Sequence, residues 1–147
     1  MDIGSGNGYP SSALSNFAPH PFTIDGVLCN SMEGFLQSLK FKEPEMQKYV
    51  CTLVGRTAKF KGAKKKWQRT QTLYWQGKEI KRESDEYDNL IAKAYDALGE
   101  NEGFQRALKA TNGCVLTHKI GRTNPSETVL TQTEFIYQLN RLRRKIK

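Results

Sequence analysis

The sequence predicts a mainly helical α+β fold in one domain that spans residues 1–147. Apolar residues recur at offsets of three, four and seven in several stretches, which is the spacing of one face of an α-helix. Two short apolar runs are each interrupted by a turn dipeptide, a pattern typical of β-hairpins. Strands and helices do not alternate along the chain, so a parallel sheet is not expected. A chain of 147 residues with 37% hydrophobic residues can bury one core.

The first hairpin is expected in "PFTIDGVLCN", where Asp25-Gly26 forms the turn between residues 22–24 and 27–29. Ser31 follows the hairpin and is a favoured N-terminal cap. We therefore expect a short helix in "NSMEGFLQSLKF", residues 30–41. Its apolar face consists of Met32, Phe35, Leu36 and Leu39.

Proline and glycine residues mark the bounds of the next two elements. Pro44 predicts the start of a second helix, because proline is favoured in the first turn, and this helix should end near Gly55. A second hairpin is expected in "TLYWQGKEI", with Gln76-Gly77 at its turn.

The C-terminal half predicts three further helices. The first lies between a Ser84 cap and Gly99, which ends it. A shorter helix stops at Asn112-Gly113, and the last begins at Thr131 and Glu134, which have the spacing of a capping box. The first of these helices has the clearest core face, formed by Tyr87, Leu90, Ile91, Ala94, Tyr95 and Leu98.

Composition excludes several classes of protein. No apolar run approaches the roughly 18–20 residues that span a bilayer, so no membrane partner is expected. The first ten residues do not resemble a signal peptide, so we expect a cytoplasmic protein with a flexible segment at residues 1–10. The cysteines are odd in number and widely spaced, so disulfides are not expected. With two histidines and no CxxC motif, no metal site is expected, and we expect no cofactor. The cysteines are Cys29, Cys51 and Cys114.

Positive charge is concentrated in the middle of the chain. The net charge is +8, and residues 42–82 carry twelve bases and three acids. The densest part is "KFKGAKKKWQR", Lys59 to Arg69, in which we expect Trp67 to be partly accessible. Such a run fits three roles: binding nucleic acid, binding a small anionic substrate, or a solvated loop that keeps the protein soluble. The charge pattern alone leaves all three open.

The helix at residues 30–41 has a second, polar face. Glu33, Gln37 and Lys40 lie at offsets of four and seven, so they form one stripe. This stripe is either a solvated surface, with Glu33 stabilised by the exposed N–H groups of the first turn, or the lining of a site. The preceding hairpin ends close to Glu33, and Gly34 leaves room for a ligand or another chain segment to approach.

A family resemblance favours the lining of a site. "LSNFAPHPFTIDGVLCNSMEGFLQSLKF", residues 14–41, resembles the signature of the NADAR family, which includes the YbiA-like N-glycosidases. Weaker similarity continues through Gly55-Arg56, Trp67 and "NEGFQRALKATNG". The matching positions of the signature are Leu14, Ser15, Asn16, Phe17, Pro21, Phe22, Asp25, Gly26, Glu33, Gln37, Lys40 and Phe41.

Two departures from the family pattern stand out. The histidine that usually follows the glutamate is replaced by Gly34. The common C-terminal acidic and W-G-x-G segment is missing, and "LTHKIGRTNPSETVLT" stands in its place, with His118 and Arg122. Roles carried by the missing family residues are therefore absent or reassigned.

The resemblance implies a compact YbiA-like helical domain that hydrolyses an N-glycosidic bond to ribose. The implied substrate is ADP-ribosylated guanine in DNA or a phosphoribosylated riboflavin-pathway intermediate. Cleavage of the bond builds positive charge on the sugar, which a carboxylate can stabilise while it deprotonates water. We assign this role to Glu33 and that of general acid to His118. Candidate substrate-binding residues are Asn16 and Gln37 for sugar hydroxyls, Lys40, Arg56 and Lys59 for phosphate, and Phe17 and Trp67 for the heterocycle.

Two non-enzymatic alternatives remain open at this point. One is a binding module that recognises ADP-ribose, NAD or DNA through the same pocket. The other is a DNA-binding accessory protein that uses the basic run Lys59–Arg69.

Overall fold

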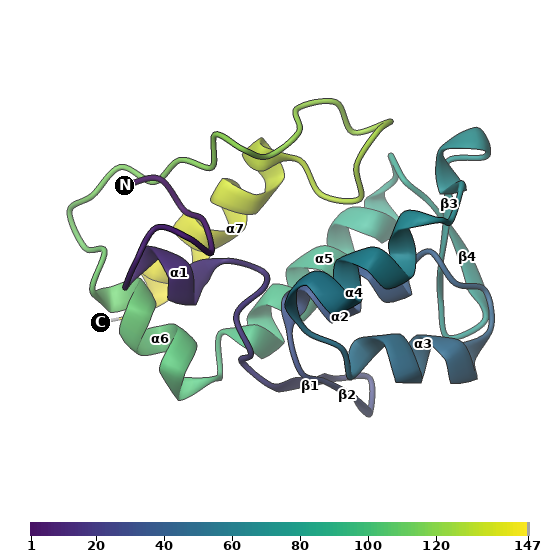
Figure 1. Ribbon diagram of the computed structural model, residues 1–147, viewed down its shortest axis with the longest axis horizontal. Coiled ribbons are helices and arrows are strands. Elements are labelled where there is room, and N and C mark those ends of the chain that lie inside the picture. The colour runs from purple at the N-terminus through teal and green to yellow at the C-terminus, as the bar shows by residue number, and fades with distance from the viewer. Residues whose placement is uncertain (147) are drawn as a thin grey trace.

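Helices form most of the structure, a computed structural model that describes residues 1–146 (Figure 1). Helices α2, α3 and α4 pack together near the two hairpins, whereas α1, α6 and α7 form the opposite end, and α5 contacts elements of both groups. The elements are α1 (Ser11–Leu14), β1 (Phe22–Ile24), β2 (Val27–Cys29), α2 (Met32–Ser38), α3 (Pro44–Cys51), α4 (Gly55–Ala63), the 3-10 helix η1 (Trp67–Arg69), β3 (Thr72–Trp75), β4 (Lys78–Lys81), α5 (Asp85–Leu98), α6 (Glu102–Lys109) and α7 (Gln132–Lys145).

Both predicted hairpins are confirmed, each with its turn at the expected dipeptide. In β1–β2, Ile24 pairs with Val27 across Asp25-Gly26. In β3–β4, Trp75 pairs with Lys78 across Gln76-Gly77. The φ angles are 50° and 78° in the first turn and 50° and 86° in the second. Two successive positive φ angles are what a two-residue type I′ turn requires, which explains the glycine in each pair.

Close packing on α3 fixes the start of α2. The Ser31 hydroxyl accepts a hydrogen bond from the Gly34 N–H (3.0 Å) and donates one to the Leu53 carbonyl (2.9 Å). A Cβ atom at Gly34 would lie 2.5 Å from the same carbonyl oxygen. The room beside Gly34 is therefore filled by the backbone that follows α3, and not by a ligand.

The C-terminal helices follow their predicted faces. All six expected core residues of α5 are buried. The capping box of α7 is confirmed: the Glu134 N–H donates to the Thr131 hydroxyl (3.1 Å), and the Thr131 N–H donates to the Glu134 carboxylate (2.8 Å). Within residues 1–146, no helix is long and apolar enough to cross a membrane.

Two parts of the chain differ from expectation. Helix α4 is not among the elements that the sequence predicts. Its buried residues are only Ala58 and Gly62, which are too small to form a recognisable apolar face. The segment expected to be flexible, residues 1–10, instead pairs with a distant segment: the Ile3 N–H donates to the Thr117 carbonyl (2.7 Å), and Ile3 is fully buried. Ile3 is buried against a segment more than a hundred residues away in the chain, and the local sequence does not show that the two segments meet.

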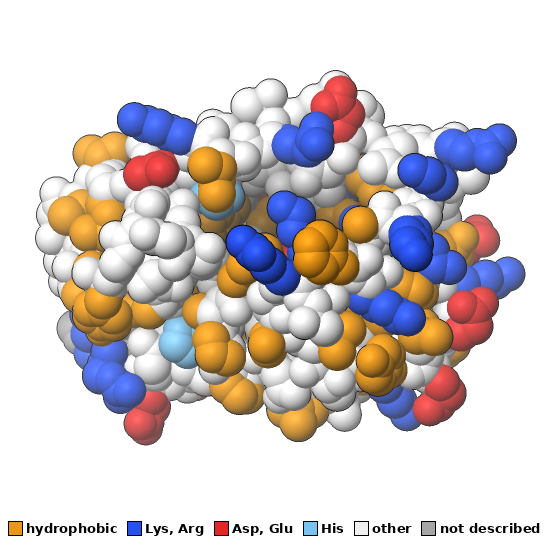
Figure 2. All heavy atoms as spheres, in the orientation of Figure 1, with side chains coloured by type: hydrophobic (Ala, Val, Ile, Leu, Met, Phe, Trp, Pro, Cys, Tyr) orange, Lys and Arg blue, Asp and Glu red, His pale blue; other side chains and the backbone are white. Residues whose placement is uncertain are grey.

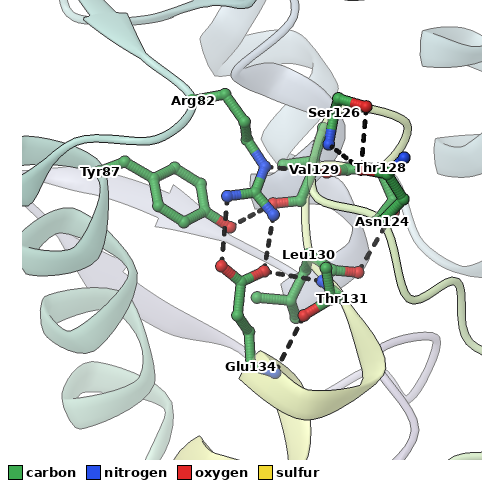
Figure 3. A network of polar contacts seen from close by, with 9 residues as sticks. All are labelled: Arg82, Tyr87, Asn124, Ser126, Thr128, Val129, Leu130, Thr131 and Glu134. Atoms are coloured by element: carbon green, nitrogen blue, oxygen red, sulfur yellow. Dashed lines mark hydrogen bonds and ion pairs between the residues drawn. The ribbon is translucent and has the colours of Figure 1, made fainter.

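A buried cation ties the C-terminal loop to the helices (Figure 3). Arg82 is 1% exposed, and its guanidinium donates to both carboxylate oxygens of Glu134 (3.2 and 2.6 Å) and to the Thr128 carbonyl (2.8 Å). It also lies 4.2 Å from the ring centroid of Tyr87, whose hydroxyl donates to the Val129 carbonyl. The chain from 128 to 134 is thus held from several directions.

We predict that Gly34→Ala lowers the free energy of unfolding by about 1–3 kcal/mol, because the added Cβ would lie 2.5 Å from the Leu53 backbone oxygen. Denaturant unfolding would measure the loss. Gly6→Ala is the matched control, since a Cβ there meets nothing within 4 Å. Equal stability of the two variants would contradict the tight junction of α2 and α3.

We also predict that Arg82→Met costs about 3 kcal/mol of stability, because it leaves the partly buried Glu134 carboxylate without its cation. The double variant Arg82→Met/Glu134→Gln should regain part of this loss, since glutamine keeps the hydrogen-bonding shape without the charge. A double-mutant cycle from denaturant unfolding measures the coupling. Additive losses would show that the pair does not act as a unit.

Candidate active site

A cleft of about 640 Å³ opens on the face shown in Figure 2, between the two ends of the molecule. Four stretches of chain line it: 5–17, 33–40, 59–68 and 118–130. Its volume lies within the range typical of small-molecule sites. Eight of the nine predicted site residues line the cleft: Asn16, Phe17, Glu33, Gln37, Lys40, Lys59, Trp67 and His118. Arg56, in the first turn of α4, is exposed and lies outside the lining.

Glu33 is held at the start of α2 by two neighbours. Its N–H donates to the Asn16 carbonyl (2.9 Å), and its carboxylate accepts from the Gln37 amide (2.7 Å). Burial raises the pKa of Glu33, while the Gln37 hydrogen bond and the charges of Lys40 and Lys59 act in the opposite direction. The Glu33 carboxyl group is therefore partly desolvated, and the two lysines offset part of the effect of burial on its pKa.

Gln37 serves Glu33 more directly than it could serve a substrate. The side chain is 8% exposed, and its amide nitrogen is engaged with Glu33. Its amide oxygen is buried and has no hydrogen-bond partner among residues 1–146. A Cβ atom at Gly62 would lie 1.9 Å from this oxygen, so the glycine lets α4 approach α2 and confine the amide. Gln37 therefore orients the carboxylate.

Asn16 lines the cleft beside Glu33. Its side-chain oxygen accepts a hydrogen bond from the Tyr95 hydroxyl (2.7 Å). Burial raises the pKa of Tyr95 well above its usual range, so this hydroxyl stays protonated and remains the donor. The Asn16 amide nitrogen is left to donate to a ligand hydroxyl. Phe17, the next residue, is half-buried and also lines the cleft.

Two lysines place positive charge beside Glu33. Lys40, at the end of the polar stripe, lies with its ammonium 3.5 Å from the Gly62 carbonyl oxygen. Burial lowers the pKa of Lys40, and the charge of Glu33 partly opposes this effect. Lys59 is exposed and reaches the cleft from α4. Together they can neutralise a phosphate group bound between α2 and α4.

The expectation of a partly accessible Trp67 is wrong. The side chain is 5% exposed and belongs to the hydrophobic core, although its edge borders the cleft. The 3-10 turn η1 directs the indole inward, while the preceding lysines stay in solvent. Trp67 therefore does not offer an open ring face for stacking.

The N-terminal segment fixes the orientation of His118. Its Nδ1 lies 2.7 Å from the Ile3 carbonyl oxygen, and its ring packs edge-on against Phe135 at a centroid distance of 4.9 Å. A carbonyl oxygen can only accept, so Nδ1 carries a hydrogen and Nε2 is the nitrogen that exchanges a proton. A Cβ atom at Gly121 would lie 2.5 Å from the His118 ring, so glycine lets the following loop pass closely over it.

Apart from Arg122, which was noted beside His118 in the sequence, the remaining wall of the cleft was not predicted. Segment 120–130 contributes Ile120, Arg122 and Thr128 among others, and Arg122 pairs loosely with Glu127 (3.8 Å). This segment is mostly irregular and shows no periodicity that would reveal which side chains face inward. Within residues 1–146, no three His, Cys, Asp or Glu side chains cluster closely enough to hold a metal ion.

Comparisons with known proteins agree with this architecture. The chain is 40% identical over 148 residues to a 17.1 kDa protein from the Gp30-rIII intergenic region of Enterobacteria phage T4, covering 97% of this chain and 96% of that protein. The fold resembles the NMR structure of the E. coli protein YbiA, with a TM-score of 0.63, 18% identity, and coverage of 99% of this chain and 83% of that chain. This confirms the YbiA-like fold implied by the NADAR resemblance. A family model described as bacteriophage protein GP30.3 matches residues 8–144, and the chain belongs to that family.

Proposed function

We propose that this protein is an N-glycosidase that hydrolyses the C–N bond between a phosphorylated ribose or ADP-ribose and a nucleobase-like heterocycle. The observation that carries the proposal is the Glu33 carboxylate, which is held by Gln37 in a nucleotide-sized cleft beside Lys40 and Lys59. The resemblance of residues 14–41 to the NADAR signature supplies the reaction class. ADP-ribosylated guanine in DNA and a phosphoribosylated riboflavin-pathway intermediate both contain such a bond.

The chemistry requires a base and an acid on the two sides of the breaking bond. Cleavage between the sugar C1 and nitrogen develops positive charge on the sugar, which the Glu33 carboxylate stabilises. The same carboxylate takes a proton from the attacking water, whose oxygen bonds to C1. The departing nitrogen gains a proton, which His118 supplies from Nε2 in its protonated form. The reaction consumes one water and leaves the phosphorylated ribose or ADP-ribose, now with a hydroxyl at C1, and the protonated heterocycle.

The remaining residues bind the substrate. Lys40 and Lys59 neutralise a phosphate group on the ribose. The Asn16 amide nitrogen donates to a sugar hydroxyl, and Phe17 offers the apolar surface for the flat heterocycle. These assignments place phosphate toward α4 and the sugar at the start of α2, where Glu33 lies.

A non-catalytic module that binds ADP-ribose or NAD is the second candidate function. Gly34 favours it, because the family residue at this position is a histidine and here the neighbouring space is occupied by backbone. Binding without turnover separates the two functions.

Glu33→Gln should lower the turnover number by about 10²–10⁴-fold, the usual contribution of a general base, and should leave substrate affinity within a few-fold of wild type. Release of ADP-ribose from ADP-ribosylated DNA, and of ribose 5-phosphate from the phosphoribosylamino-pyrimidine of riboflavin synthesis, measures turnover. Calorimetry with the variant measures affinity. No release by wild type from either compound, with tight binding to one, would favour the non-catalytic module.

Two controls show that the loss of activity is local. Glu100→Gln, an exposed carboxylate in the turn after α5, should keep full activity. Because burial raises the pKa of Glu33 in the folded chain, stability falls as the pH rises from the ordinary value of about 4.3 through the folded-state pKa. Glutamine does not titrate, so Glu33→Gln should be at least as stable as wild type at pH 8. A lower melting temperature there would show that the carboxylate is structural.

The pH dependence should identify Glu33 as the base. Activity requires the ionised carboxylate, so the acid limb of kcat/KM should lie above the ordinary glutamic acid pKa of about 4.3. The charge of Lys40 lowers the pKa of Glu33, so Lys40→Met should move the limb to higher pH, whereas Lys40→Arg should not. Lys109→Met, an exposed change at the end of α6, is the control. An unmoved limb in Lys40→Met would rule out Glu33 as the titrating group.

A further inference from the structure

A stripe of exposed side chains runs along α4 beside the cleft. Lys59 and Ala63 line the cleft. Arg56 and Phe60 on α4 and Lys64, its C-terminal cap residue, follow one another at offsets of four, so they form a neighbouring stripe about 12 Å long. All three are exposed. We call Arg56, Phe60 and Lys64 the α4 stripe.

The surroundings of the α4 stripe are strongly positive. Residues 56–69 contain seven bases and no acid. None of these seven bases forms an ion pair with a residue in the described range, 1–146, although Lys61 and Lys65 lie over the rings of Tyr49 and Phe41. Figure 2 shows Lys and Arg side chains interspersed with hydrophobic ones around the hollow in this face. A polyanion would replace the counterions that this charge holds.

Phe60 distinguishes this surface from one that serves only solubility. Its side chain is 68% exposed, while the residues that α4 buries are Ala58 and Gly62. Lysines alone would keep the helix in solution, whereas an exposed aromatic ring among them has an unfavourable contact with water. Such a ring stacks on a nucleic-acid base, whatever its identity, when cations hold the backbone nearby. A helix that lies on a membrane would instead need a broad apolar face.

We propose that the α4 stripe binds single-stranded nucleic acid, with a base on Phe60 and backbone phosphates on Arg56 and Lys64. The strand would then pass the mouth of the cleft, since Lys59 on the same helix faces into it. This binding does not rest on the proposed hydrolysis. Where both hold, the heterocycle that leaves the sugar belongs to a nucleotide within a strand.

Fluorescence anisotropy with labelled single-stranded DNA, single-stranded RNA and duplex DNA of equal length tests the proposal. Wild type should bind a single strand more tightly than the duplex. Comparison of single-stranded DNA with single-stranded RNA shows which of the two the protein prefers. Phe60→Ala should weaken single-strand binding about tenfold. Tyr137→Ala is the matched control, because this tyrosine on α7 is 57% exposed and lies outside the α4 stripe.

The contribution of Arg56 and Lys64 can be measured separately through the salt dependence of binding. Arg56→Gln and Lys64→Gln should each weaken binding to every single strand and reduce the slope of log affinity against log salt by about 0.7. Thermal unfolding should be unchanged in all these variants, since each replaced side chain is exposed.

Several results would overturn the proposal. Wild-type affinity in Phe60→Ala would show a purely electrostatic surface. Phe60-dependent binding to phosphatidylserine vesicles that exceeds binding to oligonucleotides would identify a membrane surface. No binding of any oligonucleotide at 50 mM salt would show that the α4 stripe does not bind nucleic acid. The wild-type protein separates the two proposals: hydrolysis of a small substrate without strand binding contradicts the α4 stripe alone, and strand binding without hydrolysis contradicts the N-glycosidase alone. Glu33→Gln should lose hydrolysis and keep strand binding.

Discussion

The buried guanidinium of Arg82 is the constraint on which the C-terminal wall of the cleft depends. A cation that is 1% exposed must be paired and fully hydrogen-bonded, because leaving it uncompensated in the interior is costly. Its partners are Glu134 on α7 and the Thr128 carbonyl in the preceding loop. The loop cannot move away without removing the Thr128 carbonyl from the buried guanidinium, so an irregular segment acquires a fixed position.

The opposite wall depends on close packing of two helices. Gly62 allows α4 to approach α2, and the amide of Gln37 fills the contact between them. The carboxylate of Glu33 therefore lies in a partly desolvated place that its own charge does not favour, with lysines near enough to offset part of the cost. Groups held in such unfavourable surroundings are concentrated at functional sites. The polar stripe of α2 is better explained as the lining of the cleft than as a solvated face.

Local signals in the sequence predicted most of the fold and the polar stripe on α2, whereas the other predicted residues of the cleft came from the family resemblance. Turn dipeptides and caps act over a few residues, so both hairpins and the long helices could be recognised. The polar stripe of α2 could be recognised for the same reason. Helix α4 could not, since Ala58 and Gly62 are too small to mark a buried face. The inward direction of Trp67 and the pairing of Ile3 with Thr117 depend on distant partners, and so does the loop wall.

The loop between His118 and Thr128 is held along its length through its backbone carbonyls. Gln132 donates to the Gly121 carbonyl (2.7 Å) and to the Arg122 carbonyl (2.9 Å), and the Gln71 amide donates to the Ser126 carbonyl (2.9 Å). His118 is fixed by Ile3 at one end, and Arg82 holds Thr128 at the other, while α2 lies across the cleft. The contacts to the loop carbonyls do not depend on which side chains the loop carries, so Ile120 and Arg122 can be replaced without removing them. Such replacements would alter the lining of the cleft and leave the Glu33–Gln37 hydrogen bond on the opposite wall in place.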